Sequence, residues 1–185
     1  MASTLNVQQQ KMADVAGVFR SIEIALEASA LHGIVLRPKQ VECIDHVLHG
    51  DDVLAILPTG YGKSLVFQLL PFLLPVKDDN NIVIVIAPLT SIINDQVALL
   101  EDRGVSAGVL HVPQSYDKIE SLLGEDKKDD CITIPTKIKS GQVNLLFTHP
   151  EALLSADGRD LMSSDVYRRN VVGLVVDEAH CIEFW

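Results

Sequence analysis

Short apolar runs alternate along the chain with segments in which apolar residues recur at helical spacing. The runs at 82–87 and 171–176 are continuous and rich in β-branched residues, which is typical of parallel strands covered on both faces. Less regular runs predict further strands at 53–57, 107–110 and 143–147. Because helical stretches separate the strands, the pattern predicts an α/β fold with a right-handed, mainly parallel central sheet.

Helical spacing predicts four helices between and before these runs. The first is expected to end with Gly33 as its cap, and the second to begin at Pro38 and end at Gly50. The third extends toward Leu74, and the fourth stops at Gly104. The predicted inward-facing positions are Val15, Val18, Phe19, Ile22, Leu26, Val41, Ile44, Val47, Leu48, Ile92, Ile93, Val97 and Leu100.

A glycine-rich loop joins the run at 53–57 to the third helix. Its sequence, Thr-Gly-Tyr-Gly-Lys-Ser, is a variant of the phosphate-binding loop. Gly60 and Gly62 let the backbone curl so that N–H groups face an anion, and the positive end of the helix adds to the attraction. Lys63 is then expected to reach the terminal phosphates of a nucleotide, and the Ser64 hydroxyl to bind Mg²⁺. The alternative is a simple glycine turn, which Gly-Lys-Ser after a strand argues against.

An acidic pair follows the last apolar run. Asp177 is predicted at the carboxyl end of a strand, where ligands of open α/β sheets bind, and is expected to hold Mg²⁺ opposite Ser64. Glu178 is placed to polarise the attacking water. A solvated acidic turn is the alternative, and His180 taken alone indicates a core or capping histidine. Together with the phosphate loop, the pair predicts ATP binding and favours hydrolysis.

Composition and charge narrow the class of protein. With 185 residues, 48% of them apolar, one α/β domain is expected. The formal net charge of −10 argues against a large DNA-binding surface, but not against local backbone contacts. Cys43, Cys131 and Cys181 contain no Cys-x-x-Cys pair, so a reducing compartment and no zinc site are expected. With no secretory core and no run of about 20 apolar residues, the chain is expected to be soluble and intracellular. The charged stretch 125–130 is expected to be a solvated loop.

From about residue 31 to 185 the chain resembles the first RecA-like domain of RecQ-type superfamily 2 DNA helicases. Five blocks carry the resemblance in order: Leu36-Arg37-Pro38-Lys39-Gln40 (adenine-reading motif), 58–64 (motif I), Ala87-Pro88-Leu89-Thr90-Ser91 with Asp95-Gln96 (motif Ia), 147–153 (motif Ib) and 177–182 (motif II). The Cys-Ile that follows the Asp-Glu-Ala-His box is similar to RecQ rather than to other box helicases. The resemblance implies a three-layer P-loop NTPase domain at 31–185, incomplete at its C-terminus, after a helical extension at 1–30.

The resemblance also implies residue roles. Arg37 and Gln40 would contact adenine, and His180 would couple the ATP site to the DNA side. Single-stranded DNA would be touched on its sugar–phosphate backbone by backbone amides and by Thr90, Ser91 and Thr148. The Tyr61 side chain would point away from the phosphates. Catalytic roles would fall to Lys63, Asp177, Glu178 and His180, with Glu178 acting on the attacking water. Phosphate and Mg²⁺ binding would fall to Thr59, Gly60, Tyr61, Gly62, Lys63, Ser64 and Asp177.

The implied parent protein is an ATP-dependent 3′-to-5′ DNA helicase that uses ATP and Mg²⁺, binds single-stranded and duplex DNA, and acts in the nucleus in DNA repair and recombination. This chain alone is expected to bind ATP·Mg²⁺ weakly and to unwind nothing, because it lacks the second RecA-like domain. Two alternatives stay open. The first is a nucleotide-binding or interaction module without motor activity. It is favoured by the acidic balance and by Gly33 and Leu36, which stand where aromatics are usual. A small P-loop kinase or other NTPase is the second, which the Asp-Glu-Ala-His-Cys-Ile box argues against. The sequence predicts no oligomeric state.

Overall fold

The chain divides into two compact units in a computed structural model. The first comprises Met1–Pro75 with Arg103–Val105, and the second Val76–Asp102 with Ser106–Trp185. The structure describes the backbone of residues 17–29, 31, 33–75, 80–88, 90–111 and 134–184. Some predictions lie outside this described part, namely those for Val15, Cys131, the loop 125–130 and the side chains of Ser91 and Ile92.

The second unit contains a sheet of four strands in the order β2-β3-β1-β4. The strands are β1 Ile82–Ile86, β2 Ala107–Leu110, β3 Leu145–Thr148 and β4 Val171–Val176. Every pairing is parallel, which confirms the predicted parallel α/β class of fold. All five residues of β1 are buried, as expected for a strand with a neighbour on each side and helices over its faces.

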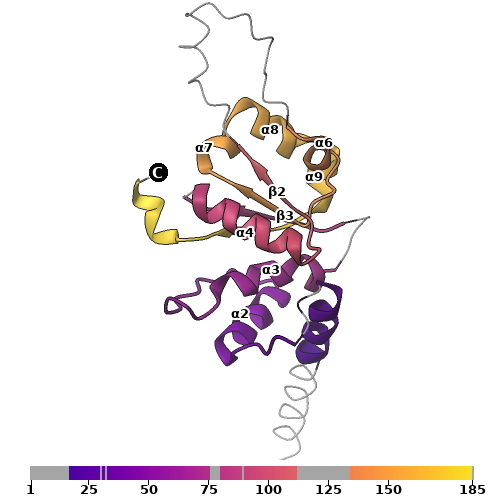
Figure 1. The fold of residues 1–185 in the computed structure, drawn as a ribbon, viewed down its shortest axis with the longest axis vertical. Coiled ribbons are helices and arrows are strands. Elements are labelled where there is room, and N and C mark those ends of the chain that lie inside the picture. The colour runs from indigo at the N-terminus through magenta and orange to yellow at the C-terminus, as the bar shows by residue number, and fades with distance from the viewer. Residues whose placement is uncertain are drawn as a thin grey trace, which may run out of the picture. The chain divides into compact units, whose positions relative to one another are not determined.

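Helices cover the sheet of the second unit. Figure 1 shows α4 on one side of strands β2 and β3, and α6, α8 and α9 on the other. The helices are α4 Thr90–Asp102, α6 Thr136–Lys139, α7 Pro150–Leu153, α8 Ala156–Ser163 and α9 Asp165–Asn170, and η2 Ala179–Phe184 is a 3₁₀ turn. One core cluster joins strands to helices and consists of Ile82, Leu110, Ile138, Val143, Leu146, Ala152, Leu161 and Tyr167. The described architecture is therefore an α/β sheet layered with helices.

An asparagine just before β1 ties together the segment that leads into β3. The Asn80 amide donates to the carbonyls of Gly141 (3.0 Å) and Val143 (2.9 Å), and its Oδ1 accepts from Asn144 Nδ2 at 2.6 Å. Asn80→Ala leaves these groups unpaired, so we expect the free energy of unfolding to fall by about 1–3 kcal/mol. Urea unfolding followed by circular dichroism measures the change. Asn94→Ala, at an exposed position of α4, is the control and is expected to change it by less than about 0.5 kcal/mol. Equal effects of the two substitutions would contradict the prediction.

The first unit is helical in its described part. Residues 17–28 form a helix, followed by α2 Pro38–Leu48 and α3 Lys63–Leu73, as predicted. The first helix differs from the prediction in two ways, because Phe19 is exposed and Gly33 lies in a turn beyond the helix end. The core of this unit comprises Val18, Ile22, Ala25, Leu31, Ile44 and Leu69.

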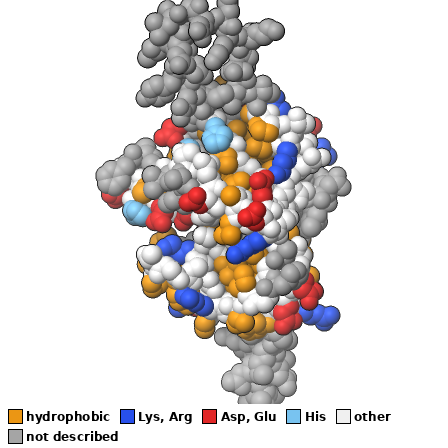
Figure 2. Space-filling model, in the orientation of Figure 1, with side chains coloured by type: hydrophobic (Ala, Val, Ile, Leu, Met, Phe, Trp, Pro, Cys, Tyr) orange, Lys and Arg blue, Asp and Glu red, His pale blue; other side chains and the backbone are white. Residues whose placement is uncertain are grey.

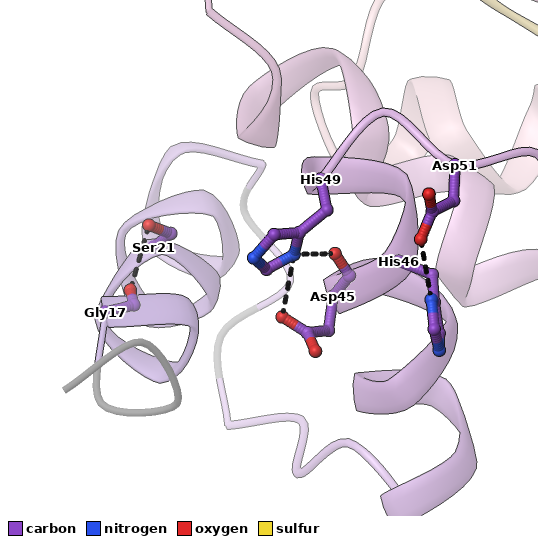
Figure 3. A network of polar contacts seen from close by, with 6 residues as sticks. All are labelled: Gly17, Ser21, Asp45, His46, His49 and Asp51. Carbon is purple, nitrogen blue, oxygen red and sulfur yellow. Dashed lines mark hydrogen bonds and ion pairs between the residues drawn. The ribbon is translucent and has the colours of Figure 1, made fainter. Parts of the chain in front are cut away.

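Two histidines near the end of α2 each face a carboxylate (Figure 3). His46 Nδ1 lies 2.9 Å from Asp51 Oδ2, and His49 Nδ1 lies 3.4 Å from Asp45 Oδ1. All four side chains are at least two-fifths exposed, so these pairs contribute little to stability. They are local contacts between residues at and just beyond the end of α2.

No helix in the described ranges has the length and apolar character needed to cross a membrane.

The predicted strand at 53–57 is absent, which corrects the sequence analysis. Its backbone joins no described strand, and the side chains of Leu54 and Ile56 are 78% and 86% exposed. A strand needs a neighbouring strand to bond its N–H and C=O groups. The described part of the first unit contains no strand that could pair with this run. The apolar run is therefore an unpaired segment and not a strand.

The burial predicted for β4 is also wrong. β4 lies at the end of the strand order and pairs only with β1 among the described strands, and Leu174 is 60% exposed. A strand at a sheet edge loses the cover that a second neighbour and its side chains provide. Figure 2 shows that apolar side chains, drawn in orange, occur on the visible surface.

Candidate nucleotide site

The glycine loop turns directly into α3. Gly60 has φ 75° and Gly62, the N-cap, has φ 89°, a left-handed backbone that favours glycine at both positions. The Tyr61 N–H donates to Pro58 O at 3.1 Å, which tightens the loop. The first-turn N–H groups of a helix lack partners inside the helix, so this end of α3 suits an anion.

Lys63 and Ser64 are the first two residues of α3 and are both half-buried. Within the described part of the chain, no hydrogen bond or ion pair engages either side chain. An amine and a hydroxyl are therefore available at the helix start. This donor set fits a phosphate group and its divalent cation, as the loop sequence predicts.

The start of α2 is bonded to the glycine loop. The Gln40 Nε2 donates to the carbonyls of Tyr61 (3.1 Å) and Gly62 (2.9 Å), and its Oε1 accepts from the Arg37 N–H at 2.7 Å. The Arg37 Nη1 donates to Gly60 O at 3.3 Å, and its guanidinium lies 4.9 Å from the centroid of the Tyr61 ring. The contact of Arg37 and Gln40 with adenine stays a prediction.

The link between Gln40 and the loop was not predicted from the sequence. Gln40 is only 2% exposed and lies on the same side of α2 as buried Cys43 and Ile44, three and four residues on. A polar residue on an inward helical face is the signal that was available, because a buried amide needs hydrogen-bond partners.

The Cys43 thiol lies on the same buried face of α2, and burial raises its pKa.

The acidic pair lies where β4 ends, as predicted. The Asp177 N–H donates to Ile86 O at 2.8 Å, which extends the pairing with β1 by one residue, and Asp177 Oδ1 accepts from the Glu178 N–H at 3.0 Å. Glu178 has φ 52° and is the only non-glycine residue of the described part with a positive φ. Such a backbone is rare for glutamate, so the turn is strained.

His180 lies beside the acid rather than in a core. Its imidazole is exposed, and Nδ1 lies 3.2 Å from Glu178 Oε2. The interpretation of His180 as a core histidine is therefore wrong.

In the described ranges, no group of three or more His, Cys, Asp or Glu residues is arranged to hold a metal ion.

The residues predicted to contact DNA differ in accessibility. Thr90 is exposed at the start of α4, and its hydroxyl lies 3.0 Å from His149 Nε2, which connects motifs Ia and Ib. The Thr148 side chain is fully buried, and its single O–H donor lies within hydrogen-bond distance of Leu110 O (3.3 Å) and His149 O (3.1 Å). A DNA contact at Thr148 in this conformation would fall to its backbone, and the contact stays a prediction.

The glycine loop belongs to the first unit and the acidic pair to the second. The structure therefore shows each half of the predicted site by itself. That Lys63, Ser64, Asp177 and Glu178 surround one nucleotide stays a prediction from the sequence.

Comparison with known proteins places this chain among helicases. Residues 37–185 match the DEAD/DEAH box helicase family. The chain is 32% identical over 149 residues to the ATP-dependent DNA helicase RecQ of Haemophilus influenzae, covering 80% of this chain and 21% of that protein. It is 32% identical over 170 residues to the ATP-dependent DNA helicase RecQ of Pasteurella multocida (88% and 24%). It is also 32% identical over 154 residues to the RecQ-like DNA helicase blm-1 of Caenorhabditis elegans (80% and 14%). The chain thus spans less than a quarter of the length of these relatives.

Proposed function

Since the chain belongs to the DEAD/DEAH box helicase family and its relatives are RecQ-type ATP-dependent DNA helicases, we propose that it forms the ATP·Mg²⁺-binding part of a 3′-to-5′ DNA helicase. The observation that carries the proposal is the glycine loop at the start of α3. Its left-handed Gly60 and Gly62 lead into a helix whose first two residues present an amine and a hydroxyl. This is the arrangement that binds nucleotide phosphates in other P-loop proteins.

In this proposal the side chains of the loop divide the work of binding. The Lys63 amine binds the terminal phosphates, the Ser64 hydroxyl binds Mg²⁺, and Thr59 lines the loop. When held there, the metal ion would supply positive charge next to the phosphates. Loop N–H groups orient the phosphate chain.

The end of β4 supplies the acid groups of the proposed site. Asp177 holds the metal ion, and its backbone is already fixed by the bond to Ile86 O. Glu178 accepts the proton of the attacking water. The contact of His180 with Glu178 supports a role for His180 in positioning that carboxylate. By analogy with RecQ-type helicases, His180 is also proposed to couple the ATP site to the DNA side.

The parent protein would act on DNA. Thr90, Ser91 and the backbone at Thr148 are proposed to touch the sugar–phosphate backbone, which positions a strand without reading its sequence. The link between Thr90 and His149 supports a shared surface of motifs Ia and Ib. Unwinding of DNA, its 3′-to-5′ direction, a nuclear location and roles in repair and recombination are proposed for the parent, by analogy with RecQ-type helicases.

Lys63→Ala is expected to weaken ATP binding about 10- to 100-fold, because a hydrogen bond to a charged group contributes about 1.5–3 kcal/mol. Isothermal titration calorimetry of this chain with ATP and excess Mg²⁺ measures the affinity. Lys139→Ala removes an exposed lysine of α6 and serves as the control, with no expected change. If Lys63→Ala binds ATP as well as the unsubstituted chain does, the ATP-site proposal is wrong.

A second candidate function is an interaction module without motor activity. The bonding of Gln40 to the loop supports it, because both N–H donors of the Gln40 amide are occupied and do not bond adenine in this conformation. The absence of aromatics at Gly33 and Leu36 points the same way. Equal ATP affinities of the Lys63→Ala variant and the unsubstituted chain would favour this function.

A further inference from the structure

We propose that Arg37, Gln40 and Tyr61 form a clamp that holds the glycine loop in its phosphate-binding shape. These three residues, called here the loop clamp, would set the affinity for the triphosphate itself. The inference rests on the proposed function, because it concerns how that same site is organised. It differs from a role in reading the adenine base, since the clamp acts on the loop backbone.

The Gln40 amide bonds both the loop and its own helix start. Its Nε2 donates to two consecutive loop carbonyls, those of Tyr61 and Gly62, and its Oε1 accepts from Arg37. A glutamine amide has only two N–H donors, so both are occupied. Gln40 Nε2 can donate to another acceptor, such as an adenine ring nitrogen, only by releasing a carbonyl of the loop.

Arg37 and Tyr61 form the exposed half of the clamp. The Arg37 guanidinium lies over the Tyr61 ring at 4.9 Å and bonds Gly60 O at 3.3 Å. A cation over an aromatic ring is attracted by the ring face. Tyr61 stands between two left-handed glycines, which are the most flexible backbone positions of the loop, so anchoring its ring restricts both.

The clamp determines which way the loop N–H groups point. It bonds the carbonyls of Gly60, Tyr61 and Gly62. In a trans peptide, each C=O and the N–H of the next residue point in opposite directions. The N–H groups of Tyr61, Gly62 and Lys63 are therefore directed away from α2, and Pro58 O takes the first of them. The remaining two are left to face an anion.

The Gln40 amide approaches the loop closely at Gly62. A Cβ atom on Gly62 would lie 2.7 Å from Gln40 Nε2, so the amide would have to shift and give up its bonds to the loop. The φ of 89° separately favours glycine at this position. The loop sequence and the buried glutamine are matched to each other.

The test compares ATP with inorganic tripolyphosphate, each with Mg²⁺, by calorimetry on this chain. Tyr61→Ala and Arg37→Ala are each expected to weaken both ligands about two- to fivefold, since an exposed cation–π pair is modest. Tyr61→Phe keeps the ring face and is expected to restore both affinities. The double variant is expected to lose less than the sum of the two single losses, because both changes remove the same cation–π contact, while Arg37→Ala alone also removes the bond to Gly60 O. Gln40→Ala is expected to weaken both ligands about tenfold.

A second readout needs no nucleotide. Hydrogen exchange of the peptide spanning 58–65 is expected to be faster in Tyr61→Ala and Gln40→Ala than in the unsubstituted chain, and unchanged in Tyr61→Phe. Weaker binding of ATP with unchanged binding of tripolyphosphate in Arg37→Ala and Gln40→Ala would overturn the clamp in favour of adenine reading. If Lys63→Ala leaves ATP affinity unchanged, the proposed function fails and hydrogen exchange alone decides, with unchanged exchange overturning the clamp.

Discussion

Replacing Tyr167 with alanine is expected to lower the free energy of unfolding by about 3–5 kcal/mol. The side chain is 1% exposed and lies in the core cluster with Ile138 and Leu161. Its hydroxyl donates to Ile138 O at 2.9 Å, so the substitution leaves a cavity and removes one of the two hydrogen bonds to this carbonyl, which also accepts from the Gly141 N–H at 2.9 Å. Burial also raises the pKa of Tyr167, which keeps the phenol neutral and able to donate. Urea unfolding of the whole chain, followed by circular dichroism, measures the loss.

Tyr167→Phe separates the two contributions. It keeps the ring volume and removes only the hydroxyl, so the loss is expected to be about 1–2 kcal/mol. A phenylalanine variant as unstable as the alanine variant would show that the hydrogen bond, and not the packing of the ring, dominates. An alanine variant as stable as the unsubstituted chain would contradict the packing of α9 described above.

Gly158→Ala is expected to destabilise the chain by about 3 kcal/mol, although alanine usually stabilises a helix relative to glycine. The reason is close backbone approach. A Cβ atom at this position of α8 would lie close to the carbonyl oxygens of Ala152 and Leu153, at 2.2 and 2.5 Å. Backbone atoms cannot move aside as the tip of a side chain can, so the end of α7 would have to shift.

The control for Gly158 is Gly173→Ala in β4. A Cβ atom there meets its nearest neighbour, Val83 Cγ2, at 3.7 Å, which is ordinary van der Waals contact. We expect this change to alter the free energy of unfolding by less than about 0.5 kcal/mol. Thermal unfolding of both variants decides the matter. A higher unfolding midpoint for Gly158→Ala would show that α7 and α8 do not pack as closely as described.

The sequence predicted the elements whose signals are local. Periodicity and end signals were enough for α2, α3 and α4, for the parallel strands, and for the left-handed glycines that open α3. The family match over 37–185 agrees with the fold class read from these elements. Local signals suffice here because helix spacing and continuous apolar strands each reflect burial of a neighbouring face.

Nonlocal features could not be predicted from the sequence. The run at 53–57 has the composition of a strand, but pairing depends on a neighbour that the composition does not specify. The apolar content of β4 likewise cannot distinguish a central from an edge strand, and Leu174 is exposed. The partners of Gln40 lie 21 and 22 residues further along the chain, so no local pattern names them. For the candidate site, the sequence predicted which types of residue to expect. Only the structure showed which hydrogen bonds these residues form.

The left-handed turn at Glu178 has a consequence for engineering this domain. A carboxylic acid is kept at a position where glycine or asparagine would fit the backbone better by about 1 kcal/mol. Selection for thermal tolerance alone would therefore favour losing the acid there, and such a hardened variant would lack the proposed base. Residue 178 should be held fixed in any library screened only for heat resistance.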